Sequence, residues 1–151
     1  MIKLTRIAST SIPIELLLEA DPDTSAIEQY LHQAHCFAVT ENDTVLAACV
    51  CKPTCDTECE LMNIAVWPSQ QGRKLGSQLL NFTIEELKKE GFKKVSLGTG
   101  TFGHQLTFYQ RAGFRVTRVE RDYFLEHYPE PIFENGIQHK DRLWLELDLT
   151  S

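Results

Sequence analysis

The amino-acid sequence predicts an α/β fold in which a mixed, largely antiparallel sheet is flanked by helices. Short apolar stretches predict strands along most of the chain, and one long stretch with apolar residues at helical spacing predicts a central helix. The chain has 151 residues, 42% of them hydrophobic and 24% charged, an ordinary composition for a globular protein. No linker, repeat or low-complexity segment divides the sequence, so we expect residues 1–151 to form a single domain.

The first half is expected to contain two helices and four strands. Pro13 is typical of the first turn of a helix, which Asp21 and Pro22 end. Asp23 or Thr24 can accept hydrogen bonds from the free N–H groups that begin a second helix. The expected elements are, in order, a strand over 4–8, a short helix after 9–11, a helix to 33, and strands over 36–40, 45–51 and 58–66.

The second half is expected to alternate helices with strands. The long central helix repeats leucine and isoleucine at helical spacing, and Gly91 stops it. The last strand shows an alternating pattern. The expected elements are a helix over 72–90, a strand over 95–98, a helix over 105–112, and strands over 114–120 and 142–149.

The junction between the strand over 58–66 and the central helix is the most informative part of the sequence. It reads Gln71-Gly72-Arg73-Lys74-Leu75-Gly76, a short basic turn with two glycines. A helix start leaves four N–H groups unpaired and carries a partial positive charge, so it binds phosphate groups without a metal. Two glycines allow close approach of the ligand to the backbone, and two cations add full charges. The junction therefore predicts a pyrophosphate-binding loop.

A second motif lies further along the chain, where a helix ends at Gly113 and an aromatic residue opens a strand. It reads Phe108-Tyr109-Gln110-Arg111-Ala112-Gly113-Phe114. With both motifs present, the chain resembles the GCN5-related N-acetyltransferase family over about its first 120 residues. The tail beyond resembles a narrower bacterial subgroup. In two places the chain departs from the family pattern: Lys74 replaces the middle glycine of the loop, and the segment over 98–104 lacks a commonly found asparagine. We expect Lys74 to take an ordinary helical conformation.

The resemblance implies that the chain uses acetyl-CoA as a cosubstrate and transfers its acetyl group to an amine. The loop would hold the pyrophosphate, and backbone N–H groups near Ile64 and Val66, where the strand would bulge, would hold the pantetheine arm and the thioester oxygen. Tyr109 would lie beside the thioester sulfur as the general acid, because a phenol stays protonated at neutral pH. The implied cofactor-binding residues are Ile64, Ala65, Val66, Gln71, Gly72, Arg73, Lys74, Leu75, Gly76, Ser77 and Tyr109.

The general base is less sharply indicated. Glu60 lies eleven residues before Gln71, where some members of the family carry a glutamate base, and Glu58 shares its strand face. His104 precedes the second motif and can relay protons, although a lone histidine in a loop is more often a surface residue. We take Glu60 as the expected base and keep Glu58, His104 and water as alternatives.

Charge and hydropathy exclude several classes of partner. The formal net charge of −6 argues against nucleic-acid binding, which needs a basic surface, and favours a cationic substrate. No run is long enough to span a membrane, and the first residues lead into strand-like sequence rather than a signal peptide. We therefore expect a cytoplasmic protein without membrane or nucleic-acid partners.

Five cysteines lie in one third of the chain: Cys36, Cys49, Cys51, Cys55 and Cys59. Their spacing is not that of a zinc site, and no pair of histidines accompanies them. We expect free, buried thiols, with no metal and no disulfide.

The tail over 122–135 is both aromatic and acidic, a mixture that suits recognition of an amine with an apolar body. Covering a sheet edge or forming a homodimer contact explains it equally well. Together these features predict an acetyl-CoA-dependent N-acetyltransferase that acts by direct transfer on a primary amine of a small molecule or peptide. A catalytically weak acyl-CoA sensor and a transferase for a longer acyl group are the alternatives.

Overall fold

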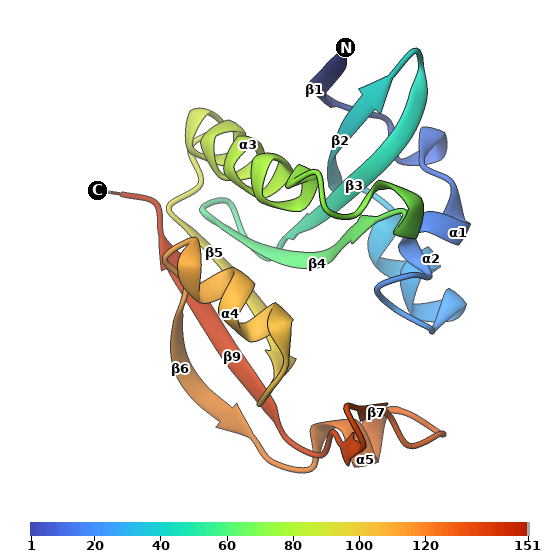
Figure 1. Ribbon diagram of the computed structural model, residues 1–151. Coiled ribbons are helices and arrows are strands. Elements are labelled where there is room, and N and C mark those ends of the chain that lie inside the picture. Colours follow the sequence, from blue (N-terminus) through green and yellow to red (C-terminus); the bar gives the residue numbers. More distant parts are fainter. Residues whose placement is uncertain (151) are drawn as a thin grey trace.

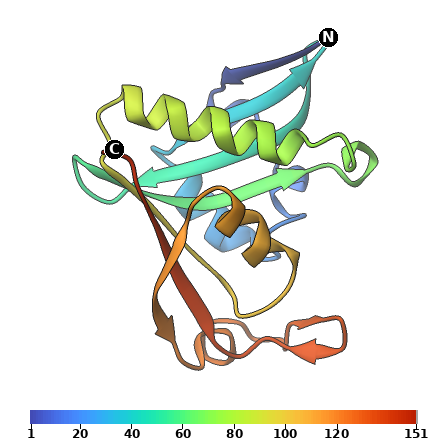
Figure 2. The same cartoon turned by 60° about the vertical axis from the view of Figure 1, so that its left-hand side comes forward.

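The structure, a computed structural model, describes residues 1–150 and shows a seven-stranded sheet with helices on both faces (Figures 1 and 2). The strand order is β1-β2-β3-β4-β5-β9-β6, and neighbours are antiparallel except β4 and β5, which are parallel. The expected mixed, largely antiparallel sheet is confirmed. Its strands are β1 (Ile2–Arg6), β2 (His35–Glu41), β3 (Thr44–Pro53), β4 (Glu58–Val66), β5 (Lys94–Gly100), β6 (Arg115–Glu120) and β9 (Arg142–Asp148).

Helices pack on the sheet in two layers, each with its own apolar core. The first core lies under α3 (Leu75–Lys89) and α4 (His104–Arg111), and the second lies under α1 (Ile14–Leu17) and α2 (Thr24–Leu31). Strand β3 is buried on both faces, so its side chains contribute alternately to the two cores. The remaining elements are η1 (Ser9–Ser11), η2 (Pro68–Gln70), α5 (Tyr123–His127), β7 (Phe133–Glu134) and β8 (Ile137–Gln138).

Local polar chemistry sets the element boundaries on the N-terminal side. Asp23 caps α2, because its carboxylate accepts a hydrogen bond from the backbone N–H of Ala26 at 3.1 Å. The helix stops before Gln33, whose left-handed φ of +62° is incompatible with the helix expected to reach residue 33. Asn42 and Asp43 have φ values of +51° and +64°, which suit the tight hairpin turn between β2 and β3.

Four of the five cysteines are buried free thiols, as expected: Cys36, Cys49, Cys51 and Cys59. Cys55 is an exception, because it lies exposed in the turn between β3 and β4. Within residues 1–150 no group of histidine, cysteine and acidic side chains could hold a metal ion. In the same part of the chain, no helix has the length and apolar character needed to cross a bilayer.

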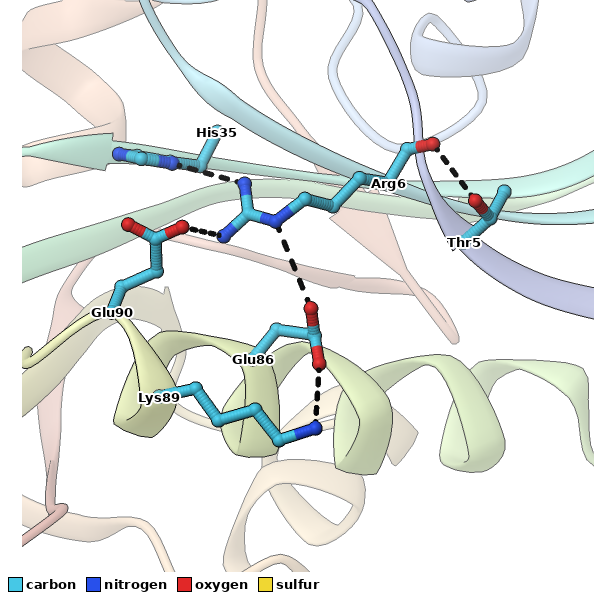
Figure 3. A network of polar contacts seen from close by, with 6 residues as sticks. All are labelled: Thr5, Arg6, His35, Glu86, Lys89 and Glu90. Atoms are coloured by element: carbon cyan, nitrogen blue, oxygen red, sulfur yellow. Dashed lines mark hydrogen bonds and ion pairs between the residues drawn. The ribbon is translucent and has the colours of Figure 1, made fainter.

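A network of charged side chains fixes the end of α3 against the first strands (Figure 3). The guanidinium of Arg6 donates to Glu90 at 2.6 Å, lies 3.7 Å from Glu86, and approaches His35 at 3.3 Å. Lys89 pairs with the same Glu86 at 3.2 Å. Because these groups are partly exposed, each pair contributes little free energy by itself, but the set orients the helix on the sheet.

The sheet opens between β4 and β5. The two strands pair only over 58–60 and 94–96, after which they diverge (Figure 2). Strand β4 also bulges at Met62, because Val50 pairs with Asn63 while Cys51 pairs with Leu61. The bulge changes which side chains face the first core, which receives Leu61 before it and Ile64 after it. The second half of β4 therefore has no neighbouring strand on the side of β5.

Candidate functional site

A cavity of about 450 Å³ lies where the second half of β4 meets the start of α3 and the face of α4. Its walls come from segments far apart in the sequence, which the sheet opening brings together. The lining residues are Glu19, Ala20, Ile64, Ala65, Val66, Gln70, Gln71, Gly72, Lys74, Leu75, Gly76, Ser77, His104, Gln105, Phe108 and Tyr109.

The loop before α3 forms one wall of this cavity, and its backbone differs from the expected one. The helix begins at Leu75 rather than at residue 72, because Gly72 has a φ of +89° and Lys74 has a φ of +61°. The expectation of an ordinary helical Lys74 is therefore wrong: the residue occupies the left-handed region, which glycine adopts without strain. Lys74 is the N-cap of α3 and makes no side-chain capping bond, so the first-turn N–H groups remain free for a ligand.

The two cations of the loop have different environments. Lys74 lines the cavity. Arg73 does not, because its guanidinium donates to the side chain of Gln70 at 2.6 Å and lies 3.7 Å from Glu41 at the end of β2. The first turn of α3 contains no acidic residue. Lys74 and the helix start thus supply positive potential to the cavity, while Arg73 ties the loop to the sheet.

The cavity wall from β4 consists of Ile64, Ala65 and Val66. This half of the strand lies beyond the last residue pair with β5, so its backbone groups on that side have no ladder partner in the sheet. The bulge that accompanies the opening is at Met62, two residues before the position expected from the sequence. Opposite this wall, a Cβ atom added to Gly76 would lie 3.7 Å from Val66 and from Phe108, an ordinary contact distance.

Tyr109 belongs both to the first core and to the cavity wall. It is 6% exposed and packs edge-to-face on Phe108 and Phe114 at centroid distances of 5.2 and 5.8 Å. Gly113, with φ +104°, turns the chain so that Phe114 returns under Tyr109, whose carbonyl accepts the Phe114 N–H at 3.2 Å. Burial, with a smaller contribution from the nearby Cys49 thiol, raises the pKa of Tyr109, so its phenol is protonated at neutral pH.

The three candidate bases occupy different places. Glu60 is half-buried and does not line the cavity, and burial raises its pKa while Arg142 opposes the shift. Glu58 forms an ion pair with Lys94 at 3.5 Å at the far end of β4. His104 lines the cavity with a side chain that is 87% exposed. Of the three candidates, only His104 lines the cavity.

A buried polar network on the second face of β4 was not expected from the sequence. The side-chain amide of Asn63 donates to the carbonyl of Leu17 and to the hydroxyl of Tyr30, both at 2.9 Å. Tyr30 in turn donates to Asp21 at 3.1 Å. The network joins α1 and α2 to β4 directly after the bulge at Met62 and places Glu19 and Ala20 at the cavity. These partners lie more than thirty positions from Asn63, so no local pattern indicates them.

Comparison with known proteins gives consistent matches. The family model described as an acetyltransferase (GNAT) domain matches residues 32–116. The uncharacterized N-acetyltransferase YvbK of Bacillus subtilis strain 168 is 41% identical over 136 residues, which cover 89% of this chain and 88% of YvbK. The crystal structure of a GNAT family acetyltransferase from Elizabethkingia anophelis with acetyl-CoA bound aligns with a TM-score of 0.90 at 37% identity, covering 97% of each chain. The ribosomal protein bS18-alanine N-acetyltransferase of Escherichia coli K12 is 32% identical over 98 residues, 64% of this chain and 63% of that enzyme.

Proposed function

The chain belongs to the GCN5-related N-acetyltransferase (GNAT) family, whose members use acetyl-CoA as a cosubstrate, and from this premise we propose that it acetylates a primary amine of a small molecule or peptide by direct transfer. The observation that carries the proposal is the cavity, in which the glycine-bearing helix start, the open half of β4 and Tyr109 share one space. These three features come from separate parts of the sequence, and it is the fold that brings them to one cavity.

In this proposal the loop over 71–77 binds the pyrophosphate of acetyl-CoA. The free N–H groups at the start of α3 donate to phosphate oxygens, and the ammonium of Lys74 adds a charge at the cavity wall. Arg73 contributes from further away and holds the loop through Glu41. The backbone groups of Ile64 to Val66 on the side without a ladder partner hold the pantetheine arm and polarise the thioester carbonyl.

The chemical step is the attack of a neutral amine nitrogen on the thioester carbonyl carbon. A tetrahedral intermediate forms, its carbon–sulfur bond breaks, and the thiolate takes the phenolic proton of Tyr109. Burial keeps that proton on Tyr109 until negative charge gathers on sulfur. The amine loses its own proton to a base. Proton exchange with water then returns Tyr109 to the phenol and the base to its unprotonated form.

Glu60 is the proposed base, and it acts through water because it does not line the cavity. Its raised pKa makes it a better base than an exposed carboxylate near neutral pH. Glu58 is disfavoured by its ion pair with Lys94, whereas His104 is nearer to the cavity and remains the alternative.

The acidic net charge of −6 and the acidic, aromatic tail support a cationic amine as the acceptor. The E. coli relative, by its name, acts on an alanine of a ribosomal protein, which makes peptide N-termini an informative class to test. An acyl-CoA sensor with the same fold would bind acetyl-CoA without turnover, and a transferase for longer acyl groups would prefer a longer thioester.

Release of the CoA thiol across polyamines, aminoglycosides, amino acids and peptide N-termini tests the proposal. Amine-dependent release above the rate with water supports transfer, and Tyr109→Phe provides the matched control for the acid. Binding of acetyl-CoA without amine-dependent release throughout would favour the sensor. Competition by longer acyl-CoA thioesters measures the acyl preference.

A further inference from the structure

A short hairpin in the C-terminal tail lies against the loop that leads into α4. Strands β7 and β8 are joined by Asn135 and Gly136, whose φ values of +53° and +78° suit a two-residue hairpin turn. After the hairpin, the backbone N–H of His139 donates to the carbonyl of Ile132 at 2.8 Å. The hairpin thereby brings Glu134 and His139 to the same side, facing the loop over 101–103.

His139 anchors the tail in the body of the protein. It is 7% exposed and stacks on Phe102 with a centroid distance of 4.1 Å. Its ring occupies space that only glycine leaves open, since a Cβ atom on Gly100 would lie 2.6 Å from the imidazole Nδ1. Its Nε2 lies 2.9 Å from Glu134, whereas Nδ1 is buried without a partner among the described residues. Because a carboxylate only accepts, the ring carries its proton on Nε2 and donates it to Glu134.

Glu134 connects this anchor to the start of α4. Its carboxylate fills the space beside Gly103, where a Cβ atom would lie 2.7 Å from Oε1. Gly103 is the N-cap of α4, with φ +104° and no side-chain capping bond. The other carboxylate oxygen lies 3.8 Å from Nδ1 of His104, the first residue of the helix. A negative charge at a helix start is favourable, because the first-turn N–H groups carry partial positive charge.

The helix that begins here supplies much of the cavity wall, including His104, Phe108 and Tyr109. We propose that Glu134 is a positioning residue, which holds the loop over 101–103 and the first turn of α4 so that Tyr109 keeps its place at the cavity. The catalytic part of this inference rests on the proposed function, in which Tyr109 is the acid. The tail is then a part of the transferase site and is more than a cover for the sheet.

Hydrogen exchange measures the positioning without reference to catalysis. In Glu134→Ala, amides of the peptide over 101–111 should exchange about tenfold faster, as expected for the loss of a bond to a charged group. Exchange in Glu134→Gln should lie between that of the wild type and that of Glu134→Ala, because its amide oxygen still accepts from His139 while the charge beside the helix start is lost. Glu130→Ala removes an exposed carboxylate of the same tail and should change nothing. The inference would be overturned if exchange of the peptide over 101–111 were unchanged in Glu134→Ala, or if the amides of α3 exchanged faster by the same factor.

Kinetics then show whether the positioning acts through Tyr109. Glu134→Ala should lower kcat about tenfold while the KM for acetyl-CoA changes less than about twofold, and Glu134→Gln should restore most of the rate. In a Tyr109→Phe background, the same alanine substitution should lower kcat by less than about twofold, because the group that it positions is already absent. If Glu134→Ala lowered kcat about tenfold in both the wild type and the Tyr109→Phe variant, Glu134 would not act through Tyr109.

The two proposals fail in different ways. If Tyr109→Phe retains full kcat, Tyr109 is not the acid, and the action of Glu134 on catalysis through it is also wrong. Faster exchange in Glu134→Ala would still support its hold on α4 in that case. If Tyr109→Phe loses activity but Glu134→Ala keeps both its exchange and its kcat, the proposed function stands and the positioning role is rejected.

Discussion

Replacing Lys74 by glycine should raise stability and weaken acetyl-CoA binding at the same time. Lys74 has φ +61° and ψ +25°, a left-handed conformation that costs a residue with a side chain about 1–2 kcal/mol. Glycine removes this cost but loses about 0.5–1 kcal/mol through its greater freedom in the unfolded chain. The net gain is about 0.5–1 kcal/mol, which for a chain of this length raises Tm by about 1–4 °C.

The same substitution removes an ammonium group from the cavity wall. Loss of one charge-assisted contact to a phosphate should raise the Kd for acetyl-CoA by about three- to tenfold. Lys74→Ala is the matched variant, because it removes the same charge but keeps a Cβ atom in the left-handed region. Alanine should therefore weaken binding similarly without raising Tm.

Thermal unfolding of the apo protein and calorimetric titration with acetyl-CoA measure the two effects separately. A lower Tm for Lys74→Gly than for the wild type would refute the assigned backbone conformation. An unchanged Kd in both variants would show that the ammonium makes no contact with the phosphates. If Lys74→Gly and Lys74→Ala changed Tm by the same amount, backbone strain at Lys74 would be negligible.

Substitutions at three further positions test the site. Gly76→Glu should abolish the stabilisation of the protein by acetyl-CoA in thermal shift, whereas Gly76→Ala should keep it, because a Cβ atom meets Val66 and Phe108 only at 3.7 Å. Equal stabilisation of the glutamate variant would move the phosphate site elsewhere. Tyr109→Phe should lower kcat by about 10²-fold with little change in acetyl-CoA affinity, and an unchanged kcat would make Tyr109 a packing residue. Glu60→Gln should lower turnover by about 10²-fold at neutral pH, and the deficit should shrink at high pH, where free amine is abundant. Since burial raises the pKa of Glu60, the wild-type rate should rise with pH through an apparent pKa above that of an exposed carboxylate. A loss of turnover in Glu60→Gln that is the same at every pH would indicate that Glu60 positions the substrate instead.

The sequence predicts those parts of the fold that depend on local patterns. The strand over 58–66 has the bounds expected from its composition, and Tyr109 lines one cavity together with most of the loop over 71–77. Glycine and proline signals also placed most turns within a few residues. These features succeed because periodicity and turn chemistry act over short separations.

Features that depend on distant partners were not predictable in the same way. The bulge at Met62 depends on pairing with β3, and the distance of Glu60 from the cavity depends on how far β4 and β5 stay paired. Lys74 was expected to be helical because its side chain disfavours the left-handed region, yet the turn from Gly72 into α3 requires that conformation. The packing of Glu134 beside Gly103, and of His139 on Phe102, arises only when the tail folds back onto the loop before α4.

Mass spectrometry after incubation with deuterated acetyl-CoA and an amine that supports thiol release tests the central claim most directly. Direct transfer predicts an amine that carries the deuterated acetyl group, together with free CoA and unmodified protein, and it predicts far less product from Tyr109→Phe. Release of CoA without an acetylated amine, or a stable acetyl group on the protein that precedes the product, would contradict transfer by a ternary complex.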